Sequence, residues 1–113
     1  MKNKAHISPT YTKSDIVKRV AATTNKRTVI ASPWVDHVLN AIRDILMQAE
    51  PECRVEIRDF GIFEVKVTKP KPSARNPKSG NIVYVPRRRK THFKPGKVLK
   101  NFLAQPLGTG PDS

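Results

Sequence analysis

The chemistry that this sequence can perform is concentrated in its basic side chains. Between Val65 and Pro111 the chain has twelve Lys and Arg residues and no Asp or Glu, whereas the residues up to Glu64 are nearly balanced, with ten basic and eight acidic side chains. A surface kept only for solubility would mix both signs. An acid-free basic stretch of this length therefore indicates a binding surface for a polyanion, whose counterions Lys and Arg would displace. The twelve residues are Lys66, Lys69, Lys71, Arg75, Lys78, Arg87, Arg88, Arg89, Lys90, Lys94, Lys97 and Lys100.

The whole chain has the composition of one small, strongly cationic domain. It has 113 residues, a formal net charge of +13 and a pI near 10.4, and this length allows a single domain. Nucleic acid and an anionic membrane are the two obvious partners for such a charge, and acidic proteins are a weaker third.

Targeting and redox signals are few. Cys53 is the single cysteine, so no disulfide within the chain is possible, and a reducing compartment is favoured. Residues 1–11 lack the apolar run of a signal peptide, and no stretch approaches the roughly 20 apolar residues that span a bilayer. We therefore expect a soluble, cytoplasmic protein with no membrane partner.

Catalytic and metal-binding patterns are not found in the sequence. His6, His37 and His92 are scattered and have no ligand spacing with Cys53. The tripeptide at 59–61, Asp-Phe-Gly, matches a kinase metal-binding motif, but the chain is too short for a kinase and has no glycine-rich phosphate loop. We therefore expect no enzyme activity, no metal site and no cofactor.

The N-terminal part predicts a leader followed by a helix. Residues 1–11 lack periodicity and are expected to be flexible. Thr12 is a suitable N-cap, and Asp15 three positions later completes a variant of the capping box. Apolar residues then follow helical spacing to about Thr24, and residues 25–27 are expected to form a turn.

A second helix is predicted from Ser32, as the N-cap, and Pro33, as the first helical residue, to about Ala49. Its apolar residues cover more than half of the helical circumference, whereas a surface helix needs a stripe only about 100° wide. This helix is therefore expected to lie between two apolar surfaces, which calls for a partner chain. The residues are Trp34, Val35, Val38, Leu39, Ala41, Ile42, Ile45, Leu46 and Met47.

A β-hairpin is predicted after the second helix. Period-two alternation begins near Arg54, reverses at residues 59–61 and continues to Thr68. Phe63, Val65 and Val67 are expected on the apolar face, and Glu64, Lys66 and Thr68 on the opposite, polar face. Gly61 is expected to permit the backbone turn.

A long β-arm follows, over about residues 66–91. Residues 69–81 contain no large apolar side chain, so they must project into solvent, and strand character returns at 82–85. A short last helix is expected from the apolar spacing of Val98, Leu99, Phe102 and Leu103, before a flexible tail at 105–113. The predicted fold class is α+β: two N-terminal helices, a β-sheet extended into a basic β-arm, and a short C-terminal helix.

Three segments resemble one family, the HU and integration host factor family of bacterial histone-like DNA-binding proteins. DFGIFEV at 59–65 is similar to the family's G-F-G-x-F segment, RNPKSG at 75–80 to its arm-tip R-N-P-x-T-G, and FKPGKVLK at 93–100 to its F-K-P-G-K-x-L-K. The resemblance covers about residues 12–104, which we take as the domain. Asp59 stands where the family usually has Gly, and Ser79 where Thr is common.

The resemblance implies roles for residues at the arm tip. In the family the arm-tip proline, here Pro77, wedges between base pairs in the minor groove and kinks the duplex, although residues 76–79 also fit an ordinary type I turn. Arg75 and Asn76 flank it and can reach minor-groove acceptors, which distinguish base pairs poorly. The expected DNA-binding residues are Lys66, Lys69, Lys71, Arg75, Asn76, Pro77, Lys78, Arg87, Arg88, Arg89, Lys90, Lys94 and Lys97.

The expected function is sequence-tolerant binding, bending and compaction of duplex DNA in the bacterial nucleoid, by an intertwined dimer of this chain with a second copy or a related chain. Two alternatives stay open: a site-specific DNA-bending protein similar to integration host factor, and a basic RNA-binding structural protein. The extra leader at 1–11 has no role that the resemblance assigns.

Overall fold

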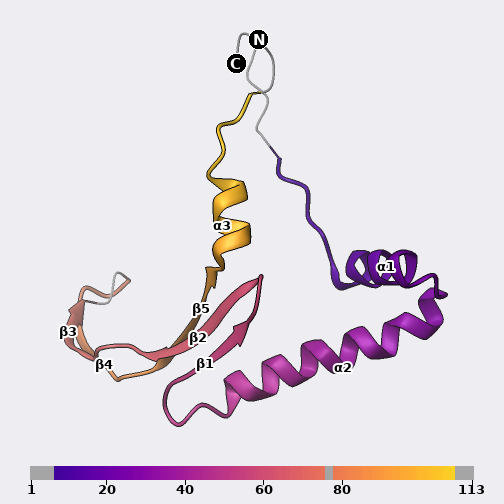
Figure 1. Ribbon diagram of the computed structural model, residues 1–113. Coiled ribbons are helices and arrows are strands. Elements are labelled where there is room, and N and C mark those ends of the chain that lie inside the picture. Colours follow the sequence, from indigo (N-terminus) through magenta and orange to yellow (C-terminus); the bar gives the residue numbers. More distant parts are fainter. Residues whose placement is uncertain (1–6, 76–77, 109–113) are drawn as a thin grey trace. The chain divides into compact units, whose positions relative to one another are not determined.

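The protein is described here from a computed structural model, which covers residues 7–75 and 78–108. The chain divides between residues 41 and 42 into two compact units. The first contains α1 and most of α2, and the second contains the end of α2, all the strands and α3 (Figure 1). The expected α+β class is confirmed.

Helix α1 (Lys13–Thr24) begins and ends as the sequence predicts. The Asp15 carboxylate accepts hydrogen bonds from the backbone N–H of Thr12 at 2.8 Å and from its hydroxyl at 3.1 Å. Asn25 ends the helix in the left-handed conformation, with φ of 57°, which Asn tolerates better than most residues. The side chains of Val17 and Ala21 are buried.

Helix α2 (Thr28–Met47) begins earlier than predicted, so the start signal at Ser32 and Pro33 is wrong. The Arg27 carbonyl accepts the first bonds, from Ile30 and Ala31 at 2.9 and 3.0 Å. Pro33 lies inside the helix, where it removes one backbone hydrogen bond. The extra turn is stabilised by packing, because it places Ala31 in the core of the first unit.

That core is small and consists of one cluster between the two helices. Val17 and Ala21 from α1 meet Ala31 and Val35 from α2, with Val20 packed against them. An ion pair of 2.7 Å between Lys13 and Asp36 also joins the helices. Tertiary burial of this kind supplies more helix stability than intrinsic propensity does.

The second unit is built on a three-stranded antiparallel sheet in the order β1-β2-β5. The strands are β1 (Cys53–Ile57), β2 (Gly61–Val67) and β5 (Arg89–Pro95). Strands β1 and β2 are the predicted hairpin. Strand β5 was not expected, because its residues contain one large apolar side chain and give no alternating pattern.

The turn between β1 and β2 corrects the role expected for Gly61. The residue with positive φ is Asp59, at 64°, and Gly61 is not in that conformation. Instead, a Cβ on Gly61 would lie 2.5 Å from the Lys94 carbonyl oxygen and 2.5 Å from the Phe93 ring. Gly61 is therefore required by the close approach of β5, and Asp59 occupies the position that favours glycine.

The arm strands β3 (Lys71–Arg75) and β4 (Ile82–Val85) form a separate two-stranded antiparallel sheet. Their register changes between Lys71 and Ala74, and Pro72 lies at this irregularity, where a missing N–H is tolerated. Helix α3 (Lys97–Leu103) follows β5 as predicted. Among the described residues, no helix is long and apolar enough to cross a membrane.

Many apolar side chains of this single chain face solvent. No large side chain among the described residues is fully buried, and the apolar face of α2 and that of α3 are both largely exposed. Exposed apolar surface on this scale marks an association site rather than a finished core. The most exposed members on these two helices are Val29, Trp34, Val38, Met47, Val98, Phe102 and Leu103.

Candidate nucleic-acid interface

The pairing of β2 with β1 and β5 sorts the sheet residues onto two faces. Residues directly opposite each other share a face, and the pairs Arg54–Glu64, Glu64–His92 and Lys66–Lys90 all lie on one side. The pair of Ile62 and Lys94 lies on this side as well. We call this side the basic sheet face; its charged and titratable members are Arg54, Glu56, Glu64, Lys66, Lys90, His92 and Lys94.

Glu64 is the centre of the basic sheet face and is buried, which corrects its predicted position on a solvent-facing side. Its residue surface is 4% exposed. The carboxylate oxygen Oε1 lies 3.1 Å from Nε2 of His92 and 3.3 Å from Nζ of Lys94. The reason for the burial is that the long side chains from β5 cover the carboxylate, and the sequence alternation did not reveal that strand.

The pKa of Glu64 is lowered below its ordinary value of 4.5. Burial is the largest single influence and raises the pKa, but the hydrogen bond and charge of Lys94, with the charges of Lys66 and His92, together outweigh it. Glu64 is therefore held as a carboxylate. It fixes Lys94 and His92 on a surface where cations would otherwise repel one another.

The other cations of the basic sheet face remain accessible. Lys66 and Lys90 are exposed, and the side chains of His92 and Lys94 are 50% and 57% exposed despite their contact with Glu64. Arg54 pairs with Glu56 at 2.9 Å on the same face. A row of long, exposed, positively charged side chains on a flat sheet suits the phosphates of a nucleic-acid backbone.

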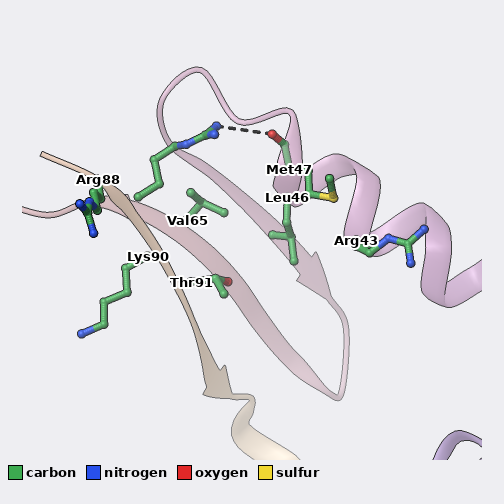
Figure 2. A pocket seen from close by; sticks show the side chains of 8 residues that line it. Arg43, Leu46, Met47, Val65, Arg88, Lys90 and Thr91 are labelled. Atoms are coloured by element: carbon green, nitrogen blue, oxygen red, sulfur yellow. Dashed lines mark hydrogen bonds between the residues drawn. The ribbon is translucent and has the colours of Figure 1, made fainter.

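The run from Arg87 to Lys90, which sequence analysis treated as one group, is divided by the structure. Arg87 and Arg88 are exposed and precede β5, and Lys90 lies on the basic sheet face. Arg89 pairs with Val67 and so lies on the opposite, apolar face. Its Nη1 donates a hydrogen bond of 2.8 Å to the Ala49 carbonyl. Figure 2 shows this region, and its dashed line is a longer bond of 3.4 Å from Arg89 to the Met47 carbonyl.

The remaining expected DNA-binding residues lie along the arm and at α3. Lys69 is exposed between β2 and β3, and Lys78 lies in a turn just before Gly80, whose φ is 76°. Lys97 is the exposed first residue of α3. Lys71 and Arg75 are strand residues of β3. The predicted wedge, Pro77, and its neighbour Asn76 lie outside the described residues.

Sequence reasoning missed three members of this surface: Arg54, Glu64 and His92. Arg54 was recognised as pointing away from the apolar face, so the alternation of β1 could have identified it. His92 and Glu64 could not be identified together, because their contact depends on the pairing of β2 with β5.

The described residues offer no set of side chains for metal chemistry. Among residues 7–75 and 78–108, no three His, Cys, Asp or Glu side chains gather as metal ligands. The chemistry that the arrangement supports is charge neutralisation and hydrogen bonding to phosphates.

Comparison with known proteins identifies the family. Residues 11–104 match the family described as "Bacterial DNA-binding protein". The chain is 39% identical to integration host factor subunit beta of Herminiimonas arsenicoxydans, over 86% of this chain and 93% of that protein. It is 35% identical to DNA-binding protein HU of Xylella fastidiosa, over 79% and 90% of the two chains. It is also similar to the HU chain of an Anabaena HU–DNA cocrystal structure, with a TM-score of 0.73 and 25% identity, over 85% of this chain and all of that one. This protein therefore belongs to the bacterial DNA-binding protein family of HU and integration host factor.

Proposed function

We propose that this protein is an architectural DNA-binding protein that binds duplex DNA with little sequence specificity, bends it, and helps to compact the bacterial nucleoid in the cytoplasm. The observation that carries the proposal is the basic sheet face, which gathers Lys66, Lys90 and Lys94 around a buried carboxylate in the same chain as a basic β-arm. The solved HU neighbour is a complex with DNA, which supports the same partner.

Two surfaces divide the work in this proposal. The sheet and arm cations contact phosphates, which positions the duplex without reading its sequence. The arm tip enters the minor groove, where Pro77 acts as the apolar wedge and Arg75 and Asn76 contact groove acceptors. Since A·T and T·A pairs look alike in that groove, selection depends on DNA shape and flexibility rather than on base identity.

The protein acts as a dimer, with a second copy or a related chain as partner. A dimer is consistent with the family, and the exposed apolar faces of α2 and α3 support it. Two chains bring two arms, and two kinks bend a duplex more than one.

A second candidate function is site-specific bending of the integration host factor type. The observation that favours it is that relatives such as the Herminiimonas protein are named integration host factor subunit beta. That function requires a preferred DNA site, whereas the first function does not.

Ring closure of short duplexes tests the proposal directly. Duplexes shorter than the persistence length of about 150 bp close poorly without bending, so the protein should raise the yield of ligated circles many-fold. Competition band shifts with unrelated duplex sequences should show similar affinities; one strongly preferred sequence would favour the second candidate. A protein that prefers structured RNA and closes no DNA circles would contradict both.

A further inference from the structure

We propose that Arg89 is a positioning residue that fastens the base of the β-arm to the end of α2, and that it does not bind a phosphate. This inference builds on the proposed DNA bending. It concerns one member of the basic run 87–90, whose neighbours keep their expected contacts with DNA.

The orientation of Arg89 separates it from the phosphate-binding cations. Opposite residues in the β2–β5 pairing share a face, so Lys90 lies with Lys66 on the basic sheet face, and Arg89 lies with Val67 on the apolar face. Its guanidinium is directed to the end of α2, where Leu46 and Met47 line the same hollow with Val65 (Figure 2).

The end of α2 needs the donor that Arg89 supplies. The last carbonyls of a helix have no partners within the helix and carry partial negative charge. The last turn of α2 contains no basic residue of its own. Ala49 is 4% exposed, and its carbonyl accepts the Arg89 hydrogen bond at 2.8 Å. Without Arg89 that carbonyl would lose its charged donor in a place with little access to water.

Two neighbouring contacts complete a fixed arm base. The Thr68 N–H donates to the Arg88 carbonyl at 2.7 Å, and the Arg88 N–H donates to the Thr68 hydroxyl at 3.0 Å. The Glu52 carboxylate accepts the Val67 N–H at 2.9 Å. Both strands that lead into the arm are therefore tied at this level, and Arg89 ties them to the helix.

Arg89→Lys is the decisive variant, with Arg88→Lys as its matched control. Both keep the positive charge, but an ammonium cannot reproduce the planar, directed donors of a guanidinium. A positioning role predicts that Arg89→Lys keeps the wild-type salt dependence of DNA binding but closes short DNA circles several-fold less at matched occupancy. Arg88→Lys should match the wild type in both assays. Wild-type ring closure by Arg89→Lys would overturn the proposal.

Neutral variants separate the two roles by the salt slope. Arg88→Met should lower the slope of log affinity against log salt by about 0.9, the loss of one phosphate contact. Arg89→Met should leave the slope unchanged. If Arg89→Met lowers the slope as much as Arg88→Met does, Arg89 is a phosphate ligand. If Arg89→Met does not fold, the Arg89→Lys comparison still decides.

A DNA-free measurement distinguishes failure of this inference from failure of the proposed function. Amide hydrogen exchange at Thr68 and Arg88 should be several-fold faster in Arg89→Lys than in the wild type, and unchanged in a Lys90→Arg control. Unchanged exchange in Arg89→Lys would contradict the anchor even if the protein bends DNA. Faster exchange in a protein that does not bend DNA would contradict only the proposed function.

Discussion

Glu64 shows how a single acid can serve a basic surface. It is the one acid within the Lys66, Lys90, His92 and Lys94 cluster that is buried, and it contacts two of these residues. Burial of a carboxylate is unfavourable unless charges and hydrogen bonds compensate it, and here they more than compensate, since the pKa is lowered. The carboxylate therefore links the stability of the sheet to the geometry of the cations above it.

The first prediction concerns the acid stability of Glu64→Gln. Because the pKa of Glu64 is lower in the folded chain than in the unfolded chain, its ionisation stabilises the fold above about pH 4.5, and this contribution is lost as the pH falls through the folded-state pKa. The wild type should melt at a higher temperature than Glu64→Gln at pH 7, and the difference should shrink on acidification toward pH 3. Circular dichroism melts across this range measure it.

Glu56→Gln is the matched control, because Glu56 lies on the same face with an exposed side chain. Its melting temperature should follow that of the wild type closely at every pH. A difference between wild type and Glu64→Gln that stays constant down to pH 3 would show that the Glu64 charge does not stabilise the fold.

The second prediction concerns the arm tip. Pro77→Ala should keep the fold and most of the DNA affinity, because the phosphate contacts remain, but it should close short circles several-fold less at matched occupancy. Unstacking a base step costs a few kcal/mol, and a methyl group is too small to fill the opened gap. The variant should also lose preference for nicked duplexes, whose kink is already partly made.

Pro70→Ala makes the same chemical change before the arm strands and should bend DNA like the wild type. Equal ring closure by Pro77→Ala and the wild type would leave Pro77 as a turn residue only. A parallel decline of binding and bending would indicate a loosened arm rather than a lost wedge.

At the scale of elements, the β1–β2 turn and strand β5 depend on each other. Gly61 opposes Pro95 in the register, and β5 lies so close that Gly61 has no room for a side chain. The rings of Phe60, Phe63 and Phe93 gather beside this contact, with centroids 4.9 to 6.1 Å apart. The aromatic cluster thus joins the turn to the third strand of the sheet.

The third prediction tests this close contact with Gly61→Ala. The added methyl would lie 2.5 Å from the Lys94 carbonyl oxygen, so the strands must separate, at a cost of about 1–3 kcal/mol in the free energy of unfolding. Asp59→Gly, two residues away, should leave stability unchanged or raise it by up to about 1 kcal/mol, since it relieves a left-handed backbone. Urea unfolding at one fixed protein concentration compares them. A neutral Gly61→Ala would show that β5 can move away freely.

At the scale of the whole molecule, charge and exposed apolar surface call for two different partners. The net charge of +13 opposes self-association, so a dimer must be held by apolar contact strong enough to overcome it. The described residues contain few buried apolar side chains and many exposed ones, which are the conditions for a core completed by a second chain.

The fourth prediction concerns that dimer. Sedimentation of the wild type at micromolar concentration should give about twice the chain mass of 12.7 kDa. Val38→Asp should sediment as a monomer or unfold, because Val38 is 57% exposed in the single chain but would be buried with an unpaired charge in a dimer. Asn40→Asp adds the same charge on the polar side of α2 and should remain dimeric. A well-folded wild-type monomer would contradict the prediction.

The sequence by itself determined the features that depend on local periodicity, capping and charge. It predicted α1 with its Thr12–Asp15 cap, the β1–β2 hairpin, α3 and the acid-free basic half, because each follows from residues close together in the chain. The arm-tip motif and the family resemblance were also available at this level.

Only the tertiary structure decided the features that depend on contacts between distant segments. The start of α2 is set by the packing of Ala31 against α1, which overrides the signal at Ser32 and Pro33. Strand β5 exists because β2 pairs with it, and this pairing buries Glu64 and turns Arg89 away from Lys90. Local pattern cannot supply such information, since the face on which a strand residue lies is fixed by the register with its partner strand.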